Sequence, residues 1–345
     1  MLGEGAARRA GRIGEALLGA GPLADLVEDP DVTDVLVNGV AGVWADRGTG
    51  LHQVSGPVGD HETVRRLAVR LAETAGRRLD DASPYVDGLL PGGVRLHAVL
   101  PPLVDGGAHI SLRVPRRRTP TIDDLTGAAT RTAAVLRRIV TRRCSFLVTG
   151  GTGSGKSTML AALLTEVAPD ERIVLVEDVR ELAIAHGHVV ALQARPANVE
   201  GQGAVDLSAL VRQSLRMRPD RVVVGEVRGA EIRDMLTALN TGHEGGCGTV
   251  HANAPADLVA RVEALGALAG MTPFATRSQL RSAISLVIHM KRHGARRVVD
   301  AVGVLQGDPA ELRVVPVLVH DGQDLVPGDA DEGREALRDV LGEEP

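Results

Sequence analysis

The residues best suited to chemistry lie in one glycine-rich run, residues 150–158, which reads GGTGSGKST. It matches the pattern G-x-x-x-x-G-K-S/T, with an apolar strand expected before it and a helix after it. In such a loop the backbone N–H groups and the helix N-terminus face a β-phosphate, and the lysine directs its charge toward the β- and γ-oxygens. The serine after the lysine would place its hydroxyl on Mg²⁺. The expected binding residues are Gly151, Thr152, Gly153, Ser154, Gly155, Lys156, Ser157 and Thr158.

Acidic residues follow two apolar stretches further along the chain. Residues 172–176 run into Glu177 and Asp178, and residues 221–225 run into Glu226. The carboxyl ends of parallel strands are where ligands bind in open α/β folds. Glu177 could orient and polarise an attacking water, while Glu226 takes the place of the acid that holds the water ligands of Mg²⁺, together with Ser157. The alternative for both glutamates is a solvent-exposed strand end.

Two histidines and a cysteine follow at intervals of four residues, His243, Cys247 and His251. This spacing raises a zinc site as an alternative, but the glycines between them would break the helix that is needed to bring three ligands to one face. We favour histidines that hydrogen-bond a γ-phosphate and sense its loss. Cys144 and Cys247 are interpreted as small buried residues.

Apolar strands that alternate with helical segments must position these groups. Beyond residue 120, the alternation indicates a parallel sheet covered on both faces. We expect strands at 146–149, 172–176, 189–193 and 221–224, and helices at 156–167, 207–216 and 230–239. Before residue 120 we expect a helix at 61–78 and strands at 33–37, 42–46, 94–100 and 109–114. We also expect β segments after residue 290.

A basic run between prolines separates these two regions. The sequence therefore predicts an α+β N-terminal domain at 1–114, a linker at 115–122, an α/β domain at 123–327 and an acidic tail at 328–345. For the tail, a flexible segment and a short final helix both remain open.

Composition excludes several classes of protein. The 345 residues carry 39 basic and 44 acidic side chains, a net charge of −5, and 44% are hydrophobic, which is typical of a globular protein. Two cysteines are too few for a disulfide framework, and no charge-free apolar stretch reaches 18 residues, so we expect a cytoplasmic protein with at most a peripheral membrane role. One Trp, one Tyr and two Phe supply no stacking platform for a nucleic acid. Lysine is also scarce, which weakens the alternative of a glycine-rich turn that ends in Lys156 by chance.

Together, four ordered segments resemble the motifs of the secretion ATPase superfamily, which includes type II secretion, type IV pilus, tight-adherence pilus and conjugative type IV secretion ATPases. The segments are Walker A at 150–158, an Asp box at 176–182, Walker B at 215–229 and a His box at 241–253. Residues 93–102 and 110–113 look like N-terminal-domain segments of the tight-adherence (Tad/CpaF-like) and conjugative branch. Two features depart from the family's pattern: the four-cysteine module of some extension and type II secretion members is absent, and the N-terminal extension of many tight-adherence relatives is short here. We therefore favour the tight-adherence and conjugative branch.

The resemblance implies a RecA-like P-loop NTPase domain with a parallel sheet, preceded by a smaller α+β N-terminal domain. Such proteins are homo-hexameric rings that hydrolyse ATP with Mg²⁺. Ring motion would drive pilus assembly or secretion through an inner-membrane platform protein at the cytoplasmic face of the membrane.

The same resemblance implies roles for individual residues. Glu177 takes the part of the catalytic glutamate and Glu226 the Walker B part. Arg95 and Arg113 would be brought from the N-terminal domain onto the nucleotide, where a guanidinium neutralises developing charge. Without the resemblance, both arginines would be interpreted as solvent-exposed strand residues. The remaining catalytic candidates are the His-box residues His243 and His251.

Two alternatives of other classes stay open. One is a nucleic-acid-translocating RecA-like motor, against which the acidic balance and the few aromatic residues argue. The other is a nucleotide-binding scaffold that does not turn over, against which the intact Lys156, Ser157, Glu177 and Glu226 argue.

Overall fold

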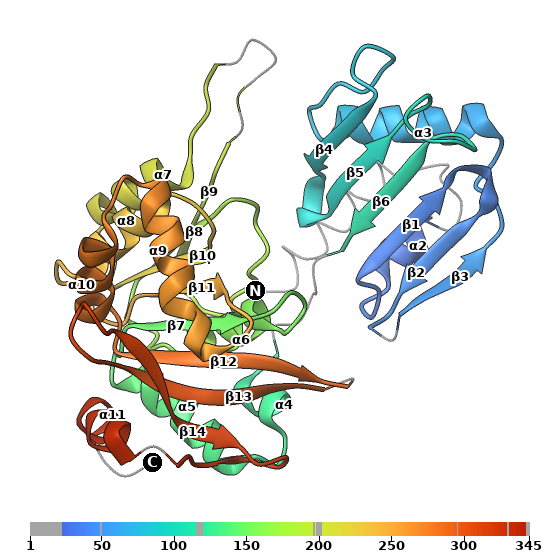
Figure 1. Cartoon of the computed structure of the whole chain (residues 1–345). Coiled ribbons are helices and arrows are strands. Elements are labelled where there is room, and N and C mark those ends of the chain that lie inside the picture. Colours follow the sequence, from blue (N-terminus) through green and yellow to red (C-terminus); the bar gives the residue numbers. More distant parts are fainter. Residues whose placement is uncertain are drawn as a thin grey trace. The chain divides into compact units, whose positions relative to one another are not determined.

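The computed structural model describes residues 23–48, 50–114, 120–195, 197, 202–294, 296–329 and 331–342. The chain divides into two compact units, Met1–Arg118 and Thr119–Pro345, drawn in Figure 1. Of the linker expected at residues 115–122, positions 115–119 lie outside the described residues, and helix α4 (Ile122–Thr126) begins at its end.

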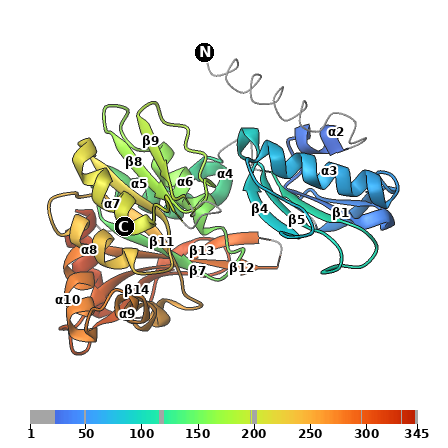
Figure 2. The same cartoon turned by 90° about the horizontal axis from the view of Figure 1, so that it is seen from above.

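The first unit is an antiparallel sheet with helices on one face. Its elements are α2 (Leu23–Glu28), β1 (Asp34–Asn38), β2 (Val43–Asp46), β3 (Leu51–Ser55), α3 (His61–Thr74), β4 (Tyr85–Leu89), β5 (Arg95–Val99) and β6 (His109–Arg113). The strand order is β3-β2-β1-β6-β5-β4, and Figure 2 shows α3 lying across the sheet. In β5, Leu96 and Ala98 are buried in the core with α3, while the alternate residues, Arg95 among them, lie on the other face.

Helix α3 follows from its capping residue and its apolar period. The Asp60 carboxylate accepts a hydrogen bond from the backbone N–H of Thr63, which begins the helix. Val64, Leu67 and Leu71, three and four residues apart, are buried on one side. The helix ends at Thr74, earlier than the expected residue 78, because Gly76 adopts a left-handed conformation with φ of 67°.

The second unit contains a nine-stranded sheet. Its strands are β7 (Phe146–Gly150), β8 (Ile173–Glu177), β9 (Val189–Gln193), β10 (Arg221–Val227), β11 (Cys247–His251), β12 (Leu286–His293), β13 (Arg296–Gln306), β14 (Arg313–His320) and β15 (Leu325–Pro327). The order is β15-β14-β13-β12-β7-β11-β10-β8-β9. The pairs from β12 to β9 are parallel, and those from β12 to β15 are antiparallel.

Helices cover both faces of this sheet. They are α4, α5 (Thr130–Thr141), α6 (Lys156–Thr165), α7 (Leu207–Ser214), α8 (Glu231–Leu239), α9 (Leu258–Leu268), α10 (Pro273–Ala283) and α11 (Arg334–Leu341). Successive residues of β7 point to opposite faces, so Leu147 packs in one apolar cluster with α7 to α10, and Val148 packs in another with α5 and α6. The prediction of a parallel sheet covered on both faces is confirmed.

Within the acidic tail, residues Arg334–Leu341 form helix α11, which packs inside the second unit. Leu337 and Leu341 of α11 are buried in the same cluster as α5 and α6, which decides the alternative that the sequence left open. Among the described residues, no single helix is long and apolar enough to cross a membrane; residues 255–268 and 273–283 pass that test only when combined across a bend of 119°.

Candidate nucleotide site

The phosphate loop connects β7 to α6 in a conformation that requires glycine. Gly150, Gly153 and Gly155 have φ values of 149°, 71° and 94°, a region that side chains rarely adopt. A Cβ at Gly150 would also lie only 2.4 Å from the carbonyl oxygen of Met290 on β12. The loop therefore has the glycine cradle that its sequence predicts.

Lys156 is buried at the start of α6, with its side chain turned back over the loop. Its Nζ donates hydrogen bonds to the carbonyl oxygens of Gly150 at 3.0 Å and Gly151 at 2.9 Å. Burial lowers the pKa of the Lys156 ammonium, and the negative charge of Glu226 acts against that shift. The Ser154 hydroxyl is buried and, within the described part of the chain, has no hydrogen-bond partner.

Glu177, the last residue of β8, is only 4% exposed. Its Oε1 accepts hydrogen bonds from the backbone N–H groups of Glu181 at 3.0 Å and Leu182 at 2.9 Å, whereas its buried Oε2 has no partner among the residues described. Burial raises the pKa of this carboxyl, although the two N–H groups oppose it. Its side chain packs against Gly225 of β10, where a Cβ would lie 2.8 Å from Glu177 Cγ. The alternative of a solvent-exposed strand end is wrong for Glu177.

Glu226 is exposed because β10 is irregular at this point. The pairing of β10 with β11 shifts register between Val224 and Val227, an irregularity of the kind that re-aims side chains beside active sites. The Thr249 hydroxyl donates a 2.7 Å hydrogen bond to the carbonyl oxygen of Gly225 and so holds the strand there. Glu226 therefore shares the carboxyl edge of the sheet with Lys156, and its negative charge raises the pKa of the Lys156 ammonium.

The two His-box candidates, His243 and His251, lie at different places in the fold. His251 ends β11 and pairs with Gly150, so it lies at the phosphate-loop edge. His243 precedes β11, and its Nδ1 lies 3.1 Å from the carbonyl oxygen of Ala238 near the end of α8. The two ends of a parallel strand lie at opposite edges of the sheet, so the fold brings only His251 to this site within the subunit.

The fold separates the three residues of the zinc alternative, because His243 and His251 lie at opposite edges of the sheet and Cys247 is buried between them. Over the part of the chain that the structure describes, no group of three His, Cys, Asp or Glu side chains could hold a metal ion. Cys247 is fully buried in β11, and burial raises the pKa of its thiol to about 12, in agreement with its interpretation as a small core residue.

Arg95 and Arg113 lie side by side in the first unit. They are direct partners in the pairing of β5 with β6, so their side chains share one face of the sheet. The Arg113 Nε donates a 3.2 Å hydrogen bond to Asp34 on β1. Their role at a nucleotide remains a prediction.

Sequence reasoning missed two residues around the loop. His289 of β12 is 2% exposed, and its Nδ1 is hydrogen-bonded to the Thr149 hydroxyl at 2.9 Å. Arg297 of β13 donates from Nε to the carbonyl oxygen of Gly153 at 3.0 Å. Asp178, which the sequence suggests as a support of the metal's water shell, forms an ion pair with Arg228. A lone histidine in the apolar run LVIHM was the one signal available for His289.

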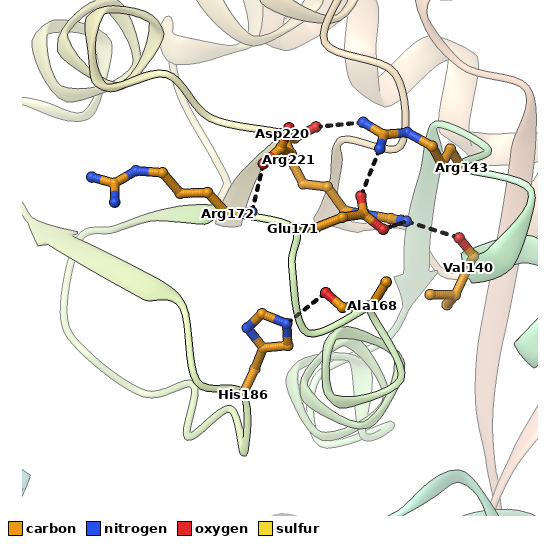
Figure 3. Close-up of polar contacts among 8 residues, drawn as sticks. All are labelled: Val140, Arg143, Ala168, Glu171, Arg172, His186, Asp220 and Arg221. Atoms are coloured by element: carbon orange, nitrogen blue, oxygen red, sulfur yellow. Dashed lines mark hydrogen bonds and ion pairs between the residues drawn. The ribbon is translucent and has the colours of Figure 1, made fainter.

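A buried ion-pair cluster fixes the opposite, amino edge of the sheet (Figure 3). Arg221, 1% exposed at the start of β10, donates from Nε and Nη2 to the two carboxylate oxygens of Glu171, each at 2.9 Å. The same Nη2 donates to the carbonyl oxygen of Val140 at the end of α5, and Arg143 pairs with Glu171 at 2.9 Å. The cluster therefore ties the strand that carries Glu226 to the segments before β7 and β8.

Comparison with known proteins places this geometry in a family. The model of the family described as "Type II/IV secretion system protein" matches residues 16–306. A putative conjugal transfer protein of Mycobacterium tuberculosis is 52% identical over 335 residues, covering 94% of each chain. The conjugal transfer protein TrbB of Rhizobium radiobacter is 35% identical, covering 66% of this chain and 70% of TrbB.

Solved structures agree on the fold. The pilus retraction motor PilT with bound ADP superimposes with a TM-score of 0.60, covering 93% of this chain and 86% of PilT at 20% identity. The expected RecA-like ATPase fold, preceded by a smaller α+β domain, is thereby confirmed. The chain belongs to the type II/IV secretion system protein family.

Proposed function

We propose that this protein is a hexameric, ATP-hydrolysing motor that powers a type II/IV secretion system or tight-adherence pilus assembly at the cytoplasmic face of the membrane. The observation that carries the proposal is one sheet edge that combines a glycine-cradled loop and buried Lys156 with the carboxylates Glu177 and Glu226. Family membership supports the transport role.

The residues present fit a magnesium-bound nucleoside triphosphate. The positive φ angles at Gly150, Gly153 and Gly155 give the loop a backbone conformation of the kind in which N–H groups form an anion-binding nest. Ser154 Oγ and Glu177 Oε2 are buried polar atoms without partners in the described chain, as expected where a polar ligand completes the site. Ser157 and, through water, Glu226 would hold Mg²⁺, which neutralises charge on the β- and γ-oxygens.

In hydrolysis, ATP and water give ADP and phosphate. The water oxygen forms a bond to the γ-phosphorus as the bond to the β–γ bridging oxygen breaks. Lys156 stabilises the charge on the phosphate oxygens. Glu177 orients the water through Oε2, the carboxylate oxygen that has no partner among the described residues, and accepts its proton; burial, which raises the pKa of this carboxyl, makes it a stronger base.

The proposal extends to the N-terminal domain and to partners. Arg95 and Arg113, paired on one sheet face, would neutralise charge at the nucleotide, and loss of the γ-phosphate would release them. This motion would be passed to an inner-membrane platform protein, with peripheral membrane association and without direct binding of nucleic acid. The relative in M. tuberculosis is described as a putative conjugal transfer protein, which favours the conjugative branch.

Phosphate release from MgATP per protomer, measured across protein concentrations, tests the proposal. Specific activity should rise with concentration, because sites completed by neighbouring subunits need assembly. It should vanish in Lys156→Ala and Glu177→Gln. Nucleotide binding measured in parallel separates the alternatives: tight binding by the wild type without phosphate release at any concentration would favour the non-hydrolysing scaffold.

A further inference from the structure

The hairpin of β12 and β13 lines the phosphate loop from its outer side. On β12, His289 and Met290 pair with Thr149 and Gly150, the last two residues before the loop turns. On β13, Arg297 reaches the loop itself. Figure 1 shows the two strands continuing past the short β7 as a long hairpin. The hairpin therefore contacts both the beginning and the tip of the loop.

Arg297 spans the tip of the loop with both halves of its side chain. A Cβ at Gly155 would lie 3.0 Å from Arg297 Cδ, so the aliphatic stem passes close over Gly155. The guanidinium Nε then donates to the carbonyl oxygen of Gly153 at 3.0 Å. One side chain thus spans the last turn of the loop before α6 begins.

A cation on a loop carbonyl affects the opposite end of the same peptide group. The N–H that shares a peptide plane with the Gly153 carbonyl belongs to Ser154, which in this structure donates a long hydrogen bond of 3.3 Å to the carbonyl oxygen of Gly151. A charge-assisted hydrogen bond to the Gly153 oxygen makes that N–H a stronger donor for a phosphate that replaces this weak contact. Lys156 makes the equivalent bonds to the carbonyls of Gly150 and Gly151. Arg297 is therefore the counterpart of Lys156 at the tip of the loop.

We propose that Arg297 is a positioning residue for nucleotide phosphates: it holds the tip of the phosphate loop through the Gly153 carbonyl and strengthens the Ser154 N–H as a phosphate donor. This inference rests on the proposed nucleotide-binding function. It makes nucleotide affinity depend on the β12–β13 hairpin, which none of the four sequence motifs includes.

The adjacent Arg296 provides a matched control. It is exposed on the same strand, carries the same charge one residue away, and alternation along β13 directs it to the other face of the hairpin. Its backbone pairs with His293, but within the described part of the chain its side chain makes no hydrogen bond or ion pair. A general effect of positive charge at the hairpin would therefore appear in both variants, whereas an effect of the contact with the loop would appear in one.

The experiment measures MgADP dissociation constants by calorimetry and steady-state KM and kcat for MgATP in the full chain. We expect Arg297→Met to raise Kd and KM about five- to tenfold, as the loss of one charge-assisted hydrogen bond would, with kcat within about twofold. Arg297→Lys, which keeps a cationic donor, should recover part of the affinity. Arg296→Met should stay within about twofold of the wild type in every constant.

Three results would overturn the inference. If Arg296→Met and Arg297→Met changed Kd and KM equally, Arg297 would act only through its positive charge and not through its contact with the loop. If Arg297→Met bound MgADP as tightly as the wild type, the contact of Arg297 with the Gly153 carbonyl would not contribute to nucleotide binding. A fall in melting temperature that accounts for the lost affinity, without rescue by Arg297→Lys, would make the role structural only. A wild-type protein that binds neither nucleotide would instead refute the proposed function, and this inference with it.

Discussion

Substitution of Gly225 by alanine should displace Glu177 without touching any residue of the phosphate loop. The new methyl carbon would lie 2.8 Å from Glu177 Cγ, whereas carbon atoms pack at about 3.5–4.0 Å. Gly225 has no positive φ, so alanine adds no backbone strain there. The Glu177 side chain must therefore shift by roughly 1 Å, which disturbs the hydrogen bonds that its carboxylate accepts from the Glu181 and Leu182 N–H groups.

The expected magnitudes follow from this overlap. Overpacking a buried site costs about 1–3 kcal/mol in the free energy of unfolding. A misplacement of about 1 Å in a reacting group can lower the rate about 100-fold, so we expect kcat for phosphate release to fall at least tenfold. In the background of Glu177→Ala the methyl has room, and the stability cost of Gly225→Ala should nearly disappear, giving a coupling energy of at least about 1 kcal/mol.

Urea unfolding by circular dichroism and phosphate release are the assays. Trp44, the only tryptophan, lies in the first unit, so its fluorescence transition should not move and serves as an internal control. Gly187→Ala is the matched substitution, because a Cβ there meets no described atom within 4 Å. The reasoning is refuted if Gly225→Ala costs the same with and without Glu177, or if it leaves stability and kcat unchanged.

Three further predictions concern the two edges of the sheet. Arg221→Met should destabilise the second unit by about 3–5 kcal/mol in urea unfolding, because it leaves the Glu171 carboxylate without its bidentate partner; a loss under 1 kcal/mol would contradict this. Burial opposes ionisation of Glu171, but Arg221 and Arg143 outweigh it and lower its pKa in the folded state. In the unfolded chain Glu171 therefore takes up its proton at a higher pH than in the folded protein. The stability that this ion pair contributes is complete above the ordinary glutamate pKa and should fall as the pH drops through the pKa of Glu171 in the folded state. In Glu171→Gln, the urea midpoint should no longer show this part of the pH dependence. Finally, His251→Ala should lower kcat for phosphate release at least tenfold and His243→Ala far less, since only His251 lies beside Gly150; equal losses would refute the separation of the two edges.

Local patterns were enough to place most strands. Residues 189–193 form β9 with the expected bounds, and the helix expected at 207–216 is α7 followed by a short 3-10 turn at Leu215–Met217. Helix α10 was missed although its start carries a signal: Thr272 accepts a hydrogen bond from the Ala275 N–H, and Pro273 occupies the first turn. Buried strands and helices of a doubly covered sheet read as continuous apolar runs, so their ends shift by a few residues.

The sequence by itself determined the glycine-rich loop between a strand and a helix, the alternation that makes a parallel sheet, and the family, because each depends on residues that are close together in the chain. Only the tertiary structure decided that Glu177 is buried against Gly225, that His243 and His251 lie at opposite edges, and that Arg297 holds the loop across 144 positions of sequence. These facts depend on strand order, on register and on one irregularity in β10. Packing between distant segments sets all three, and no local period or spacing encodes them.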